Sequence, residues 1–148
     1  MLQRPQIHIT ALDIAGADLR SEISKLFDTF LSMEKSGSCI QQLNVNDTQI
    51  SDSVAHIMVN YLTNTTKLTK FKCGNNPTLF RKGDYSCIGD LIRGNKTLKN
   101  LHISDLNLPT EQIDNIFDAI VNHPSLMKLT LDGNPAGSYM DKISQLLA

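Results

Sequence analysis

A short hydrophobic pattern, in which an aliphatic residue is followed by others three and five positions later, recurs along the whole chain. It first reads Ile9-x-x-Leu12-x-Ile14. The later copies read Ile40-x-x-Leu43-x-Val45, Leu68-x-x-Phe71-x-Cys73, Leu98-x-x-Leu101-x-Ile103 and Leu126-x-x-Leu129-x-Leu131. The first positions recur every 28 to 31 residues. Such regular self-similarity predicts five stacked copies of one unit, each with a strand at this pattern.

The segments between the strand patterns have apolar residues at helical spacing. They predict amphipathic helices of about three turns over 23–30, 54–62, 88–92, 113–120 and 140–147. Ser51 or Ser53, Asp84 and Thr110 precede three of these stripes and are candidate helix caps, with Pro109 favouring an extended entry before Thr110. The predicted unit is therefore strand, turn, helix, turn.

The turn after each strand has one position where a polar side chain would satisfy exposed backbone groups. This position holds Ala17, Thr48, Asn76, Leu106 and Asn134. We expect Asn76 and Asn134 to do so fully and Thr48 in part. The turns at Ala17 and Leu106 are expected to be held mainly by packing.

The joins from helix to strand carry a resemblance to a known family. They read Asn64-Thr65-Thr66-Lys67-Leu68, Gly94-Asn95-Lys96-Thr97-Leu98 and Asn122-His123-Pro124-Ser125-Leu126. These resemble the recurrent join of leucine-rich repeats of the ribonuclease-inhibitor type, and the resemblance covers residues 7–147. That family includes intracellular nucleotide-sensing receptors, actin-end cappers of the tropomodulin type, GTPase-activating proteins for Ran, and effectors injected by intracellular bacteria.

The resemblance implies an α/β leucine-rich-repeat solenoid, a right-handed superhelix with parallel strands on the concave face and helices on the convex face. It implies one domain over residues 1–148, with repeats at about 7–36, 37–65, 66–95, 96–123 and 124–148. The function it implies is binding of another protein.

Composition narrows the function classes further. The 148 residues carry a net charge of −1, so no global field favours nucleic acid or an anionic membrane. No apolar run approaches the ~20 residues of a membrane-spanning helix, and Met1–Pro5 lack the apolar segment of a secretory signal. We expect a soluble, cytoplasmic protein, located in the host cytoplasm if it is a bacterial effector. Trp is absent, which predicts an aliphatic, layered core without aromatic anchors.

Candidate catalytic and metal-binding chemistry is sparse. The cysteines, Cys39, Cys73 and Cys87, are odd in number and widely spaced, which indicates reduced thiols, with Cys73 an inert core thiol. The four histidines fall in different repeats without the spacing of a zinc site. We therefore expect no enzyme activity, no metal, no cofactor and no small-molecule substrate.

The candidate binding surface consists of the strand residues that alternate with the core positions. These predict a partner-binding set of Asn44, Lys70, Lys72, Asn100, His102 and Lys128. Lys70, Lys72 and Lys128 should lie towards one edge of this face, and Asp47, Asp105 and Asp132 towards the other. Such a charge pattern would steer a complementary partner, or it is ordinary solvated surface charge.

The third unit carries a basic, glycine-containing segment over 73–84, which we expect to protrude as a loop. Arg81 in this segment is a candidate flank of the binding surface. The alternative is that an irregular repeat simply has a longer loop.

Two other functions remain open. One is GTPase activation of the Ran-activator type, although neither Arg81 nor Arg93 matches that family's functional residue by motif. The other is a structural or regulatory segment of a larger protein. Ser144–Ala148 form no polar terminal cap, so we expect either truncation from a longer chain or self-association through this end.

Overall fold

A computed structural model describes residues 9–20, 22–37, 40–80, 87–135 and 139–148. Its five strands are β1 (Ala11–Asp13), β2 (Gln42–Asn44), β3 (Lys70–Lys72), β4 (Asn100–His102) and β5 (Lys128–Thr130). They form one parallel sheet in the order β1-β2-β3-β4-β5. The middle residue of every strand is the one that the hydrophobic pattern placed at its centre, so the prediction of five parallel strands is confirmed.

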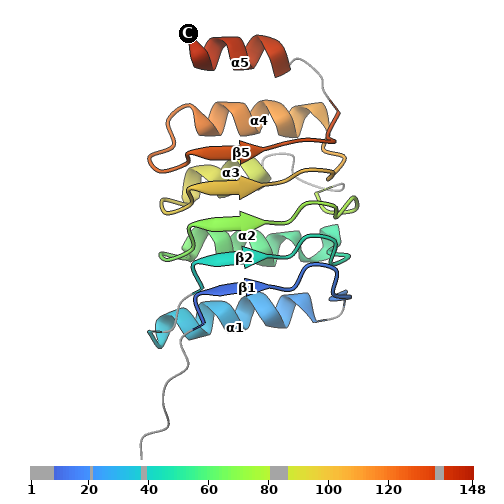
Figure 1. Ribbon diagram of the computed structural model, residues 1–148, viewed down its shortest axis with the longest axis vertical. Helices are drawn as coiled ribbons and strands as arrows, with labels where there is room; N and C mark the ends of the chain where they lie inside the picture. The colour runs from blue at the N-terminus through green and yellow to red at the C-terminus, as the bar shows by residue number, and fades with distance from the viewer. Residues whose placement is uncertain (1–8, 21, 38–39, 81–86, 136–138) are drawn as a thin grey trace, which may run out of the picture.

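A helix follows each strand, as predicted. The helices are α1 (Ile23–Lys35), α2 (Ala55–Asn64), α3 (Cys87–Gly94), α4 (Thr110–Ile120) and α5 (Tyr139–Leu147). Consecutive helices from α1 to α4 pack against one another, and Figure 1 shows α2 and α3 behind the sheet. Within the described residues, one side of the sheet is therefore free of helices.

The predicted helix caps were wrong where the structure describes them. Ser51 and Ser53 hydrogen-bond to each other at 2.7 Å, and a short 3-10 helix, η1 (Asp52–Val54), leads into α2. Thr110 is the first residue of α4 and Pro109 precedes it, without a side-chain cap. The third candidate, Asp84, lies outside the described residues.

Burial follows the expected alternation in the middle of the sheet and weakens at its two ends. Leu43, Phe71 and Leu101 are buried, whereas their strand neighbours are partly or fully exposed. At the ends, Ile9 is 49% exposed and Leu129 is only partly buried. Ile9 was expected to point into the core, but the first unit has a neighbour on one side only.

The core does contain aromatic anchors, contrary to the expectation from composition. Phe27 and Phe30 of α1 pack around Tyr61 of α2, with ring centroids 5.5 Å and 5.9 Å from that of Tyr61. All three side chains are buried. These aromatic side chains contribute to holding the first two units together.

Two of the turns are held by a side chain from the following unit. Asn76 is buried, and its Oδ1 accepts hydrogen bonds from the backbone N–H groups of Thr48 and Ile50 in the preceding unit. Asn134 does the same for Leu106 and Leu108. The expectation that packing mainly holds the Leu106 turn missed these hydrogen bonds from Asn134.

The third unit is less loop-like than expected in its described part. Leu79 and Phe80 are buried in the core, although the sequence around them predicted a protruding loop. Phe80 reaches this position with a backbone φ of 63°, a left-handed conformation that is rare for an aromatic residue. Arg81 and the basic residues that follow lie outside the described residues.

The C-terminal unit is packed less tightly than the others. Phe117 and Ile120 of α4, Leu129 of β5 and Ile143 of α5 line a hollow of about 490 Å³. Lys142 of α5 forms an ion pair with Asp114 of α4 at 3.1 Å. Self-association through this end stays a prediction.

Candidate functional site

Six of the seven predicted binding residues lie together on the helix-free side of the sheet. Lys70, Asn100 and Lys128 occupy equivalent positions on β3, β4 and β5 and form one row across the strands. Asn44, Lys72, His102 and Thr130 form a second row two residues further along. We call these two rows the strand face. The seventh predicted residue, Arg81, lies outside the described residues.

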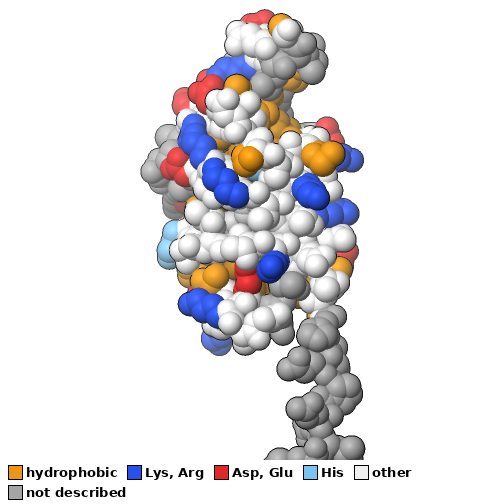
Figure 2. All heavy atoms as spheres, turned by 90° about the vertical axis from the view of Figure 1, so that its left-hand side faces the viewer, with side chains coloured by type: hydrophobic (Ala, Val, Ile, Leu, Met, Phe, Trp, Pro, Cys, Tyr) orange, Lys and Arg blue, Asp and Glu red, His pale blue; other side chains and the backbone are white. Residues whose placement is uncertain are grey.

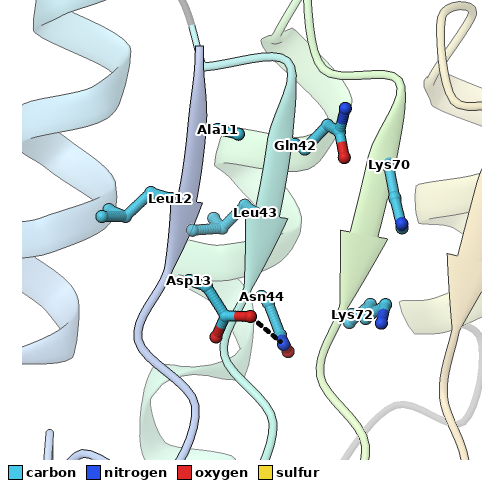
Figure 3. Close-up of a pocket in the computed structure, with 8 residues that line it drawn as sticks. All are labelled: Ala11, Leu12, Asp13, Gln42, Leu43, Asn44, Lys70 and Lys72. Carbon is cyan, nitrogen blue, oxygen red and sulfur yellow. Dashed lines mark hydrogen bonds between the residues drawn. The ribbon is translucent and has the colours of Figure 1, made fainter. Parts of the chain in front are cut away.

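Two shallow hollows run across the strand face. The first has a volume of about 210 Å³ and lies over β1, β2 and β3 (Figure 3). The second has a volume of about 270 Å³ and lies over β3, β4 and β5. Lys70 and Lys72 line both, so the two hollows meet at β3.

Asp13 of β1 adjoins the strand face and pairs with Asn44 at its end. The Asn44 Nδ2 group donates a hydrogen bond to Asp13 Oδ2 at 3.0 Å, drawn as a dashed line in Figure 3. Asp13 Oδ1 also accepts one from the Ala15 N–H group. The hydrogen bonds from Ala15 and Asn44 lower the pKa of the Asp13 carboxyl. At this end of the face, the Asp13 carboxylate is ionised and already accepts two hydrogen bonds.

His102 lies at the centre of the second hollow and packs over a glycine. A Cβ atom added at Gly74 would lie 2.9 Å from His102 Nε2, so the ring occupies space that only glycine leaves open. Partial burial lowers the pKa of His102, and the charge of Lys72 lowers it further, against opposite effects of Asp132 and Asp105. The imidazole is therefore neutral at neutral pH.

The lysines of the strand face form no ion pair with a described carboxylate, although the charge of Lys72 contributes to lowering the pKa of Asp13. Within the described residues, Lys70, Lys72 and Lys128 take part in no ion pair and no side-chain hydrogen bond. Elsewhere, cations pair with carboxylates, as in Arg20–Asp18, Lys25–Glu22, Arg93–Asp90 and Lys142–Asp114. Three cations without an ion pair therefore lie together on the strand face, while others, such as Lys35 and Lys96, lie elsewhere in the described part of the chain.

Sequence reasoning missed a continuation of this charge beyond the strands. Lys99 is exposed immediately before β4, and Lys67 is exposed shortly before β3. Figure 2 looks at this end of the molecule and shows Lys and Arg side chains spread over it. Lysines near helix C-termini also offset the helix dipole, which is why the pattern alone does not single these residues out. What distinguishes Lys99 is its place directly beside Asn100 of the strand face.

Other chemistry does not assemble in the described part of the chain. No group of three His, Cys, Asp or Glu side chains lies close enough to hold a metal ion there. Cys73 is fully buried, and burial raises the pKa of its thiol, as expected for an inert core cysteine. None of the described helices has both the length and the apolar character needed to cross a membrane.

A five-stranded parallel sheet with its helices packed on one side defines the general class of fold, and comparison with solved structures makes it specific. The chain shares its fold with the C-terminal domain of tropomodulin from Caenorhabditis elegans, at 14% identity and a TM-score of 0.68 over 94% of this chain and 82% of that one. It also matches actin-binding site 2 of leiomodin-1, at 16% identity and a TM-score of 0.61 over 93% and 78% of the two chains. The sequence matches no model of a protein family and no curated protein.

These neighbours correct the family resemblance drawn from the sequence. The matching structures are tropomodulin and leiomodin domains, so the description of the chain as a ribonuclease-inhibitor-like leucine-rich-repeat protein was wrong. The mixed α/β class and the all-parallel sheet stand. The spacing of hydrophobic residues reflects the need of each unit to bury its own strand and helix. Different families of stacked units share this need, so the spacing does not distinguish them.

Proposed function

We propose that this protein binds a protein partner through the strand face and acts by binding, without catalysis. The observation that carries the proposal is the convergence of six polar and basic side chains on adjacent strands, around two hollows that meet at Lys70 and Lys72. Short parallel strands hold these side chains on a rigid platform, so little ordering is needed on binding. The expected setting is the cytoplasm.

A structural neighbour supports protein binding in general. The matching domain of leiomodin-1 is named as an actin-binding site. Identity to that domain is 16%, so we use actin only as the first candidate partner to test. If actin does not bind, capture from cell lysate followed by mass spectrometry supplies other candidates.

The test is the double variant Lys72→Glu with His102→Glu. Both side chains lie on the strand face and neither belongs to the buried core, so the variant should lose partner binding while remaining folded, with a free energy of unfolding lowered only by the lost packing of His102 on Gly74. Binding is measured by isothermal titration calorimetry and unfolding by urea titration. Full affinity in the double variant would refute the proposal and direct attention to the helices or to the hollow beside α5.

A further inference from the structure

We infer that the partner presents an acidic protein segment, which lies across β3, β4 and β5 with its carboxylates against Lys70, Lys72 and Lys128. This inference rests on the proposed function and adds the chemistry of the partner. The inference is carried by three cations that line one hollow together and form no ion pair within the described part of the chain.

The three lysines are close enough to act on one ligand. Neighbouring strands lie about 4.8 Å apart, and residues advance about 3.3 Å along a strand. The Cα atoms of Lys70 and Lys72 are therefore about 7 Å apart, and those of Lys70 and Lys128, two strands apart, about 10 Å. The side chains of Lys70, Lys72 and Lys128 line the second hollow together.

Their proximity leaves an electrostatic cost in the free protein. Like charges within a Debye length of about 8 Å at physiological ionic strength repel each other, and the Cα separation of Lys70 and Lys72, about 7 Å, lies within this length. The neighbouring imidazole of His102 responds to the same field, because the charge of Lys72 lowers its pKa beyond the effect of burial. Carboxylates of a partner would relieve this repulsion. They would lose part of their hydration against a surface that is already ordered before binding.

The surroundings favour a protein segment over a polyanion such as nucleic acid. Asp105 and Asp132 lie just beyond the carboxyl ends of β4 and β5 and are exposed, so a continuous negative backbone would meet repulsion there. Asn100 and Thr130 lie between the lysines and offer amide and hydroxyl groups to a peptide backbone. Lys99 extends positive charge away from the aspartates, which gives an acidic segment a route over the amino-terminal edge of the sheet.

The experiment measures binding of the full chain to a labelled glutamate-rich peptide by fluorescence anisotropy. A glutamine-rich peptide of the same length serves as the uncharged control. We expect only the glutamate-rich peptide to bind, with an affinity that falls as salt is raised. Lys70→Gln with Lys128→Gln should weaken binding about tenfold. The control pair, Arg20→Gln with Lys25→Gln, makes the same change in net charge and should alter binding less than about twofold.

Three results would overturn the inference. They are absence of binding by the glutamate-rich peptide, equal loss in the two double variants, and tighter binding of a single-stranded oligonucleotide of matched charge. Asn100→Tyr separates this inference from the proposed function, because it blocks the face without changing charge. Suppose that this variant no longer binds the native partner, while Lys70→Gln with Lys128→Gln still binds it at all salt concentrations. Binding through the strand face is then supported, and the acidic character of the partner is refuted. If Asn100→Tyr keeps the native partner, the proposed function itself falls.

Discussion

Replacing Asn76 with Ala should be among the most destabilising single changes in the chain. The side chain has no solvent exposure and connects two units. Its Oδ1 accepts the Ile50 N–H at 3.0 Å and the Thr48 N–H at 3.2 Å. Its Nδ2 lies 2.9 Å from the Cys73 carbonyl and 3.1 Å from that of Val45.

The magnitude follows from these four hydrogen bonds. Each contributes about 1 kcal/mol net, and a buried donor left without a partner costs about 1–3 kcal/mol. We therefore expect Asn76→Ala to lower the free energy of unfolding by about 4 kcal/mol. That is a large share of the roughly 5–15 kcal/mol of an ordinary domain.

Asn134 provides a matched comparison. It makes the corresponding bonds to Leu106 and Leu108, but it is 8% exposed in the last unit, where water can replace part of what is lost. We expect Asn134→Ala to cost about 1–2 kcal/mol. Asn122→Ala, on the surface before β5, should change stability by less than about 0.5 kcal/mol.

The measurement is urea unfolding followed by far-ultraviolet circular dichroism. The three variants are compared with the same dependence of the free energy of unfolding on urea concentration. An Asn76→Ala variant within about 0.5 kcal/mol of the parent would refute the assignment of Asn76 as a bridge between units. An Asn134→Ala variant that loses as much stability as Asn76→Ala would instead contradict the argument that water replaces part of the lost bonds at the more exposed Asn134.

Three further predictions concern single positions. Leu101→Ala should cost about 2–5 kcal/mol in urea unfolding, because it leaves a cavity in a buried layer, and an unchanged midpoint would contradict this. Because burial and Lys72 lower the pKa of His102 from 6.5, the unfolded state binds more protons below that pH. Stability should fall as pH drops from about 6.5 towards the folded pKa, less so in His102→Asn, and identical pH profiles would exclude the effect. His123→Ala should lose about 1–2 kcal/mol, since its Nδ1 accepts the Leu126 N–H at 2.8 Å. His123→Asn should lose less, because Asn95 plays this part in the preceding unit, and equal losses would count against that role.

The candidate site was predictable from the sequence as a set of positions, though not as a charge environment. Alternation along a strand places Lys70 and Lys72 on one face whatever lies around them. Which lysines have a carboxylate nearby depends on side chains from other units, as for Lys142 beside Asp114. The continuation of positive charge from the strand face to Lys99 was recognised only when the ion pairs of the other cations were known.

What the sequence by itself determined is the repeating unit and the centre of each strand. Leu43, Phe71 and Leu101 are predictable because a strand buries every second residue, and that period is a property of the local backbone. The same local rule cannot say which family of folds the units build. A chain that shares only 14% of its residues with this one has the same fold.

What only the tertiary structure decided are the relations between units. Asn76 satisfies backbone groups of Thr48 and Ile50 because stacking brings a turn some 28 residues away into hydrogen-bond distance. His102 lies over Gly74 for the same reason. The hydrophobic pattern predicts the register of the strands, but it does not say which side chains of neighbouring units meet in the turns and on the strand face.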